Sequence, residues 1–391
     1  MKIIIAPDSF KESLSALDIA NTIKAGFCEI FPEADYIIRP IADGGEGTVE
    51  AMVHALKGEI ITTTITDPLG EKGTAFYGLS GDKRCAIIEM AAASGLERVP
   101  TEKRDAKTTT SYGTGELILD ALDKGARQFI IGIGGSATND GGAGMLQALG
   151  VKLLDDAGQQ IGYGGKNLRQ LVRIDMQAID PRLADCQFEV ACDVTNPLTG
   201  QQGASAVFGP QKGASCEDIA LLDKALKHFA KIIKRDLGRD VEHIPGTGAA
   251  GGMGAGLLAF LNAQLKPGIE IITEQLQLAP LIQQADLVIT GEGRLDHQSL
   301  NGKVPIGVAT LAKKYHKPVI AIVGSFGEKA ESVYPYGISA MFSILSRIST
   351  LESALQPQTT KDNLFLSARN IAATLKMGYQ LGQHEYYQKV R

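Results

Sequence analysis

Short apolar stretches alternate along most of the chain with longer segments whose apolar positions recur at helical spacing. Residues 2–6 (KIIIA) predict a first β-strand. Residues 15–30 predict a helix, because Ile19, Ile23 and Phe27 recur on one face. The same alternation predicts further strands at 36–41, 285–290, 318–323 and 339–345, and further helices at 46–57, 303–315 and 362–376. Such alternation is typical of α/β proteins with largely parallel strands.

The middle of the chain has a different pattern. Residues 60–67 and 73–79 are rich in threonine and alternate in polarity around a Pro-Leu-Gly turn, which predicts antiparallel strands. Apolar runs at 128–134 and 187–192 predict buried strands. We therefore expect two α/β domains. Residues 1–66 and 270–391 would form a discontinuous, doubly wound Rossmann-like domain, and residues 67–269 a second α/β domain inserted into it.

Length and composition favour a folded protein of ordinary polarity. A chain of 391 residues is long for one hydrophobic core. The mean hydropathy is +0.01, and no apolar run approaches the roughly 20 residues of a membrane helix. A net charge of −5 gives no electrostatic case for nucleic-acid binding. The five cysteines are scattered without a CxxC pair, which favours reduced thiols. We expect a cytoplasmic protein without nucleic-acid or membrane partners, either a monomer or a homodimer.

Glycine clusters in loops that follow predicted strands. The chain has 45 glycines, more than an average composition gives, and clustered glycine lets a ligand approach the backbone closely. The first loop, 6–13, follows the first strand and contributes candidate binding residues Asp8, Ser9 and Ser13 and candidate catalytic residue Lys11. The second loop, 42–48, places candidate binding residues Gly44 and Gly45 between candidate metal ligands Asp43 and Glu46.

The third loop, 132–144, has the richest set of candidate groups. Six glycines in thirteen residues can present a nest of N–H donors to a phosphate. Polar side chains accompany them, and the candidate binding residues are Gly134, Gly135, Ser136, Thr138 and Asn139. The chain has no GxxxxGK[ST] motif, so nucleotide binding would use a cradle other than a Walker A loop.

Two later loops add carboxylates and cations. The fourth loop, 192–198, contributes Asp193 as a candidate metal ligand or general base and Asn196 as a candidate binding residue. The fifth loop, 290–303, contributes Glu292 as a candidate metal ligand, and Arg294, Asp296 and Lys303 as candidate catalytic residues. Cations beside carboxylates can bind a substrate carboxylate or neutralise a developing phosphoryl charge.

Two other interpretations have less support in the sequence. Residues 246–251 match GxGxxG, but no convincing strand precedes them, as a dinucleotide-binding fingerprint requires. They are better explained as a glycine-rich loop that leads into a helix of small residues, although a nicotinamide oxidoreductase stays an alternative. The GxSxG elbow of the Ser-His-Asp hydrolases is absent.

Taken together, the loops resemble those of the bacterial glycerate kinase family. The stretches that carry the resemblance run from the N-terminus past residue 300: APDSFKESLSA at 6–16, IADGGEGT at 41–48, GIGGSATNDGGAGM at 132–145, CDVTNPL at 192–198 and ITGEGRLDHQSLNGK at 289–303. The resemblance implies two α/β domains with the site in the cleft between them. It also implies an ATP-dependent kinase that phosphorylates glycerate, with transfer to the 2-hydroxyl giving 2-phosphoglycerate.

The expected mechanism assigns each group of residues a part in phosphoryl transfer. The third loop would hold the ATP phosphates, and Asp43, Glu46 or Asp193 would hold Mg²⁺. Lys11, Arg294 or Lys303 would bind the glycerate carboxylate or the moving phosphoryl group, and Asp193 or Asp296 would accept the proton of the attacking hydroxyl. The alternatives are transfer to the 3-hydroxyl, a related sugar acid as substrate, and a non-catalytic protein that binds a hydroxy acid.

Overall fold

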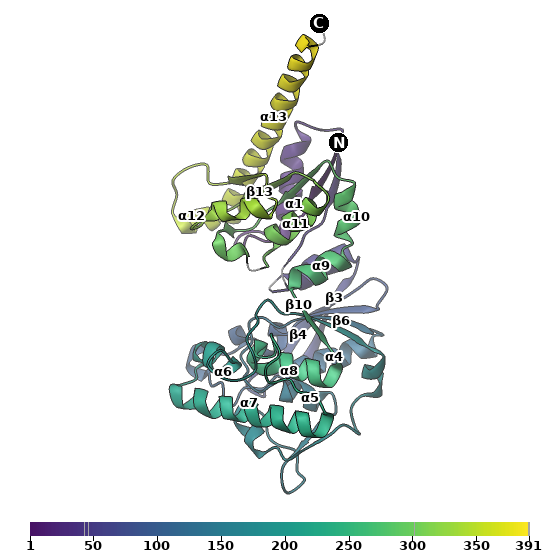
Figure 1. Cartoon of the computed structure of the whole chain (residues 1–391), viewed down its shortest axis with the longest axis vertical. Helices are drawn as coiled ribbons and strands as arrows, with labels where there is room; N and C mark the ends of the chain where they lie inside the picture. The colour runs from purple at the N-terminus through teal and green to yellow at the C-terminus, as the bar shows by residue number, and fades with distance from the viewer. Residues whose placement is uncertain (43, 46, 301, 390–391) are drawn as a thin grey trace. The chain divides into compact units, whose positions relative to one another are not determined.

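The computed structural model describes residues 1–42, 44–45, 47–300 and 302–389. The chain divides into two compact units (Figure 1). Unit 1 combines Met1–Asp43 with Ile272–Arg391, and unit 2 is Gly44–Ile271. The structure is mixed α/β with parallel strands in both units, which confirms the fold class expected from the sequence.

The described part of unit 1 is built on a five-stranded parallel sheet in the order β15-β13-β11-β1-β2. Its strands are β1 (Lys2–Ile5), β2 (Asp35–Ile38), β11 (Leu287–Thr290), β13 (Val319–Val323) and β15 (Ala340–Ser343). β1, β11 and β13 are almost wholly buried, as expected for parallel strands covered on both faces. Each of these strands overlaps a strand predicted from the apolar runs.

Helices connect the strands of unit 1 and cover the sheet. Ile19, Ile23 and Phe27 of α1 (Ala16–Cys28) are fully buried in the same core as Leu364 and Ala368 of α13 (Pro357–Lys389). The two helices pack side by side (Figure 1). This unit also contains α10 (Leu278–Gln283), α11 (Val304–Lys314), α12 (Leu351–Leu355), the short strand pair β12 (Arg294–Leu295) and β14 (Ser325–Phe326), and 3₁₀ helices at His297–Leu300 and Ala330–Tyr336.

The described part of unit 2 is built on a six-stranded mixed sheet in the order β10-β9-β6-β5-β4-β3. β5, β6, β9 and β10 are parallel, whereas β3 and β4 form an antiparallel hairpin with β4 also antiparallel to β5. The strands are β3 (Glu59–Thr66), β4 (Lys72–Leu79), β5 (Cys85–Glu89), β6 (Gln128–Gly132), β9 (Gln187–Ala191) and β10 (Gln264–Lys266). The hairpin confirms the antiparallel strands predicted from alternating polarity.

Helices and a second hairpin complete unit 2. The helices are α2 (Thr48–Ala55), α3 (Ala91–Ser94), α4 (Tyr112–Asp123), α5 (Ala143–Ala148), α6 (Ala204–Phe208), α7 (Cys216–Leu237) and α8 (Ala249–Leu261), and the hairpin pairs β7 (Lys152–Leu154) with β8 (Arg173–Asp175). α7 begins at a capping box in which Ser215 and Asp218 bind each other's backbone N–H groups. α9 (Gly268–Gln275) follows β10.

The predicted first domain boundary, near residue 66, falls at the end of β3. In the structure β3 pairs along its whole length with β4 in the sheet of unit 2, because the turn at 67–71 folds the two strands into one hairpin. The positions of the domain boundaries in solution stay a prediction.

Candidate active site

The first and fifth loops leave neighbouring strands of unit 1 at the point where the strand order reverses. The chain runs from β1 to β2 in one direction across the sheet and from β11 through β13 to β15 in the other. A backbone hydrogen bond of 2.8 Å from Asp8 N to Gly291 O joins the two loops directly after their strands. In open parallel sheets, ligands bind in the crevice at such a reversal.

Charged side chains of the fifth loop are close together. Lys303 Nζ lies 3.4 Å from Glu292 Oε2, and Arg294 Nε lies 3.4 Å from Asp296 Oδ2. The two carboxylates are largely buried, while Arg294 is 65% exposed and Lys303 is 37% exposed. The arrangement holds the acids in place and leaves both cations open to a ligand.

Ser299 is a partner of Glu292 that the sequence analysis did not single out. Its hydroxyl donates to Glu292 Oε1 at 2.5 Å and accepts from Asp296 N at 3.2 Å. Burial raises the pKa of Glu292 above its ordinary value, while Ser299 and Lys303 oppose the rise. Ser299 therefore ties the two acids of this loop together and favours the charged form of Glu292.

The candidates of the first loop have different surroundings. Asp8 is buried, and its Oδ1 accepts from Ser9 N at 2.6 Å. Lys11 is exposed. Ser13 Oγ lies 2.6 Å from Thr360 Oγ on α13, so this hydroxyl binds a helix of its own unit. Asp8, Ser9 and Lys11 thus lie on the loop beside the fifth loop, whereas the Ser13 side chain bonds to α13.

In unit 2, loops gather at the carboxyl ends of the parallel strands. Glu89, Gly132 and Ala191 end β5, β6 and β9 and lie in register with one another. Gly44 packs against these strand ends: a Cβ on Gly44 would lie 2.5 Å from the Ala191 Cβ, and a Cβ on Gly132 would overlap the Gly44 carbonyl oxygen. The second, third and fourth loops therefore share one edge of this sheet. Gly45 O accepts from Thr48 Oγ1 at 2.6 Å, which fixes the start of α2.

The third loop has an exposed tip and a buried polar base. Gly134 and Gly135 are exposed, and a Cβ on Gly134 would meet no atom within 4 Å. Ser136, Thr138 and Asn139 are buried. Within the described part of the chain, Thr138 Oγ1 and Asn139 Oδ1 are buried without a hydrogen-bond partner. Unpartnered buried polar atoms are rare in folded proteins, and a catalytic role or a bound water or ion is among their explanations.

Asp140 anchors the end of the third loop. It is fully buried, and its carboxylate accepts from Ser111 N, Ser111 Oγ, Gly142 N and Gly144 N at 2.8–3.2 Å. The loop is fixed on its other side by hydrogen bonds from Ala137 N to Ser94 O and from Leu96 N to Gly135 O. The backbone of this loop is therefore held before any ligand binds.

Lys212 is the main candidate that the sequence analysis missed. It lies on the 3₁₀ turn Pro210–Lys212, is 2% exposed, and donates from Nζ to Ser136 Oγ at 2.7 Å and to Thr138 O at 2.6 Å. Burial lowers the pKa of Lys212 to about 7, and the Asp140 charge opposes this shift. The lysine between glycines in GPQKG at 209–213 is the sequence signal that could have drawn attention to it.

The fourth loop follows β9 at the same sheet edge. Asp193 is exposed, and its Oδ1 accepts from Gly268 N at 3.0 Å. Asn196 Nδ2 donates to Gln202 O, and Asn196 O accepts from Gly246 N and Gly248 N. Asn196 therefore connects the fourth loop to the glycine-rich segment at 246–251.

The GxGxxG segment supports the third loop. No strand lies between α7 and this segment in the described residues, and a hydrogen bond of 3.0 Å runs from Gly141 N to Gly251 O. Gly251 has φ +65°, and a Cβ there would overlap the Thr138 carbonyl oxygen. These glycines permit close packing of two backbones, in agreement with the interpretation of this motif as a structural loop.

Two of the candidate metal ligands, Asp43 and Glu46, lie outside the described residues. Among the residues that are described, no group of three or more His, Cys, Asp or Glu side chains could hold a metal ion. Glu292 lies within them, in the fifth loop beside Lys303 and Ser299.

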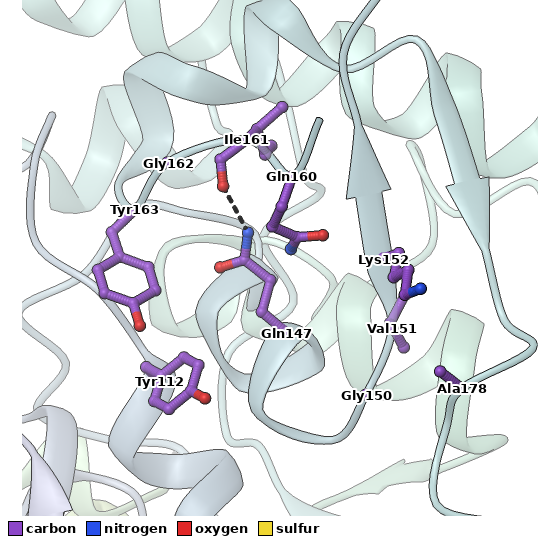
Figure 2. Close-up of a pocket in the computed structure, with 10 residues that line it drawn as sticks. All are labelled: Tyr112, Gln147, Gly150, Val151, Lys152, Gln160, Ile161, Gly162, Tyr163 and Ala178. Carbon is purple, nitrogen blue, oxygen red and sulfur yellow. Dashed lines mark hydrogen bonds between the residues drawn. The ribbon is translucent and has the colours of Figure 1, made fainter. Parts of the chain in front are cut away.

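A pocket of 540 Å³ lies in unit 2 (Figure 2). Figure 2 shows the rings of Tyr112 and Tyr163 on one side and Lys152 and Ala178 on the other. The ring centroids are 5.3 Å apart, and Gln147 Nε2 donates to Ile161 O. None of the sequence-predicted site residues lines this pocket.

No helix in the described part of the chain is long and apolar enough to cross a membrane.

Comparison with known proteins gives a consistent result over nearly the whole chain. The model of the "Glycerate kinase family" matches residues 3–376. The chain is 60% identical to glycerate 2-kinase from Escherichia coli K12, over 97% of this chain and 99% of that protein. It is 55% identical to a glycerate kinase from Bacillus subtilis 168, over 96% of this chain and 98% of that protein.

A solved structure has the same fold. A crystal structure provisionally described as glycerate kinase 2 from Salmonella typhimurium LT2 superposes with a TM-score of 0.91 at 59% sequence identity. The match covers 97% of this chain and 99% of that one.

Proposed function

The chain belongs to the glycerate kinase family, and from this membership we propose that it phosphorylates glycerate with ATP. The observation that carries the proposal is the match over residues 3–376, which includes all five candidate loops. The geometry is compatible with this proposal. Exposed cations lie beyond the carboxyl ends of the strands in the unit 1 sheet, and a preorganised glycine-rich loop lies beyond those of the unit 2 sheet.

We place phosphoryl transfer at the 2-hydroxyl, which gives 2-phosphoglycerate. The support is the 60% identical relative, which is named glycerate 2-kinase. The location of the active site in a cleft, and the state of the protein as a monomer or homodimer, stay predictions.

The third loop is the proposed site of the ATP phosphates. Its exposed glycines Gly134 and Gly135 allow an anion to approach the backbone, and backbone N–H groups bind phosphate oxygens well. Hydrogen bonds at both ends of the loop fix its shape, so little ordering is needed when the nucleotide binds.

The fifth loop, with Lys11, is the proposed site of the anionic part of the acid substrate. Arg294 is well suited to a carboxylate because its planar guanidinium can donate two parallel hydrogen bonds. Lys303 offers a compact charge that can neutralise the moving phosphoryl group. Both cations are exposed despite their carboxylate neighbours, as a ligand-binding role requires.

One aspartate accepts the proton of the attacking hydroxyl in this mechanism. The candidates are Asp193, which is exposed, and Asp296, which is 12% exposed and beside Arg294. A positioned general base contributes about 10²–10⁴-fold to the rate. The remaining acceleration comes from orientation and charge neutralisation, the main demands of phosphoryl transfer.

Mg²⁺ fits the donor chemistry of these loops. It binds oxygen ligands and is usually held by one or two carboxylates together with substrate phosphates, so a group of three acidic side chains is not required. Glu292 and Asp296 offer carboxylate oxygens on one described loop, and Asp193 offers another. A bound Mg²⁺ would neutralise phosphate charge during transfer.

We propose the cytoplasm as the location. All five cysteines lie in described parts of the chain and all are free thiols, which is usual in a reducing compartment.

A coupled assay of ADP release tests the proposed function. We expect ADP release from Mg·ATP to depend on D-glycerate, to stop when EDTA removes the metal, and to resume when Mg²⁺ is restored in excess. ADP release no faster than in the no-glycerate control would show that the assignment is wrong. A panel of related sugar acids then ranks the substrates.

A further inference from the structure

The segment that contains α6 and the following 3₁₀ turn holds the third loop from its buried side. Ser205 Oγ accepts from Asn139 Nδ2 at 2.9 Å. Lys212 Nζ donates to Ser136 Oγ at 2.7 Å and to Thr138 O at 2.6 Å. These bonds fix the loop over residues 136–139.

When it is protonated, Lys212 brings a positive charge under this loop without a direct counter-ion. Its hydrogen-bond partners are a hydroxyl and a backbone carbonyl, and no ion pair joins it to a carboxylate within the described residues. The carboxylate that acts on it electrostatically is Asp140, whose oxygens already accept from Ser111, Gly142 and Gly144. A buried cation without an ion-pair partner is costly, and an anion bound nearby reduces that cost.

The bond from Lys212 also determines how Ser136 can interact. Because Ser136 Oγ accepts from Lys212, the hydroxyl hydrogen of Ser136 points away from Lys212. Ser136 is adjacent in sequence to the exposed Gly134–Gly135 tip and is itself 6% exposed. The hydroxyl hydrogen is therefore available to a group that binds at the tip.

We propose that Lys212 is a positioning residue for phosphate binding: it orients the Ser136 hydroxyl to donate to a phosphoryl oxygen of ATP and places a positive charge behind that oxygen. This inference rests on the proposed function only in assigning the ATP phosphates to the third loop. Burial lowers the pKa of Lys212 to about 7, and a bound anion would favour the protonated side chain.

Calorimetric titration of Lys212→Met with Mg·ATP and, separately, with D-glycerate tests the proposal. We expect binding of Mg·ATP to weaken about tenfold or more, as loss of a charge-assisted hydrogen bond predicts, with D-glycerate affinity unchanged. Lys234→Met is the matched control, because Lys234 is an exposed lysine of the same unit, paired with Asp240. It should bind Mg·ATP as the wild type does.

Changes at Ser136 separate positioning from a merely structural role. Ser136→Ala should also weaken Mg·ATP binding about tenfold, and Ser136→Thr, which keeps the hydroxyl, should restore most of it. In the Ser136→Ala background, Lys212→Met should have less than about one third of its effect in the wild type, because the two residues act through one bond.

Full Mg·ATP affinity in folded Lys212→Met or in Ser136→Ala would overturn the proposal. Equal weakening of Mg·ATP and D-glycerate binding would do so too, because it would show general disruption of the site. If Lys212→Met does not fold, the two Ser136 variants still decide. These titrations measure binding and not phosphoryl transfer, so a wild type that binds ATP but does not phosphorylate glycerate would refute the proposed function and leave this inference standing.

Discussion

Lys212 illustrates how much one buried side chain can contribute to the chemistry of this protein. Its partners Ser136 and Thr138 lie 76 and 74 residues away in sequence. The sequence shows a lysine in a glycine-rich turn but not its burial or its contacts, because these arise only when α6 packs against the third loop. For the same reason the sequence indicated Glu292 but not Ser299, whose contact depends on the local fold of the fifth loop.

The low pKa of Lys212 predicts a pH dependence of stability. Between about pH 7 and 10 the unfolded chain keeps this lysine protonated, while the folded chain releases the proton. The unfolded state then binds more protons, so the contribution of Lys212 to stability rises with pH. From pH 7 to pH 9 the wild type should gain about 2 kcal/mol in free energy of unfolding relative to Lys212→Met.

Urea unfolding of both proteins at the two pH values measures this gain. Lys234→Met serves again as the control, since its exposed side chain should produce no such difference. The contrary outcome is that the wild type and Lys212→Met differ in free energy of unfolding by the same amount at pH 7 and at pH 9. That result would show that the pKa of Lys212 is not lowered in the folded protein.

A second question at the scale of the residue is which aspartate acts as the general base. We expect one of Asp193→Asn and Asp296→Asn to lower kcat by about 10²–10⁴-fold, because an amide cannot accept the proton. The other variant should change KM more than kcat. Asp185→Asn, an exposed aspartate outside the candidate loops, should behave as the wild type. Near-normal kcat in both site variants, with native circular dichroism, would remove the aspartates from the mechanism.

At the scale of elements, the apolar pattern was sufficient to predict the strands that position the loops. Parallel strands buried on both faces give continuous apolar runs, as in β1 and β13, and the β3–β4 hairpin gives alternation. The sequence did not reveal the strand order, because pairings such as β1 with β11 join residues more than 280 positions apart. That order places the first and fifth loops at the reversal in the sheet.

The packing of Gly251 on the third loop yields a prediction for this element. Gly251→Ala would put a methyl group against the Thr138 carbonyl oxygen at a positive φ. We expect a loss of about 2–4 kcal/mol in free energy of unfolding, together with weaker Mg·ATP binding. Gly238→Ala is the matched control, because Gly238 has φ +70° but a Cβ there would meet no atom within 4 Å, and it should lose only about 1 kcal/mol.

Both variants can be compared by urea unfolding and by calorimetric titration with Mg·ATP. Equal losses of stability would mean that the cost comes from the backbone conformation alone. The close contact between Gly251 and the third loop would then have no energetic importance.

At the scale of the whole molecule, the chain keeps the family pattern from residue 3 to residue 376. The sequence predicted this family through the order of the five loops, since any one of them alone would have been weak. The roles of individual residues could not be predicted with the same force, because a carboxylate at the end of a strand can serve as a base, as a metal ligand or as a loop anchor. Asp140, held entirely by hydrogen bonds from its own surroundings, is an anchor.

Phosphorus NMR of the complete reaction tests the central claim most directly. Purified protein is incubated with Mg·ATP and D-glycerate, and the phosphorus spectrum is followed against authentic 2-phosphoglycerate and 3-phosphoglycerate. We predict that the γ-phosphate signal of ATP is replaced by that of 2-phosphoglycerate, with ADP formed in equal amount. A spectrum in which ATP persists, or in which inorganic phosphate appears without phosphoglycerate, would contradict the account.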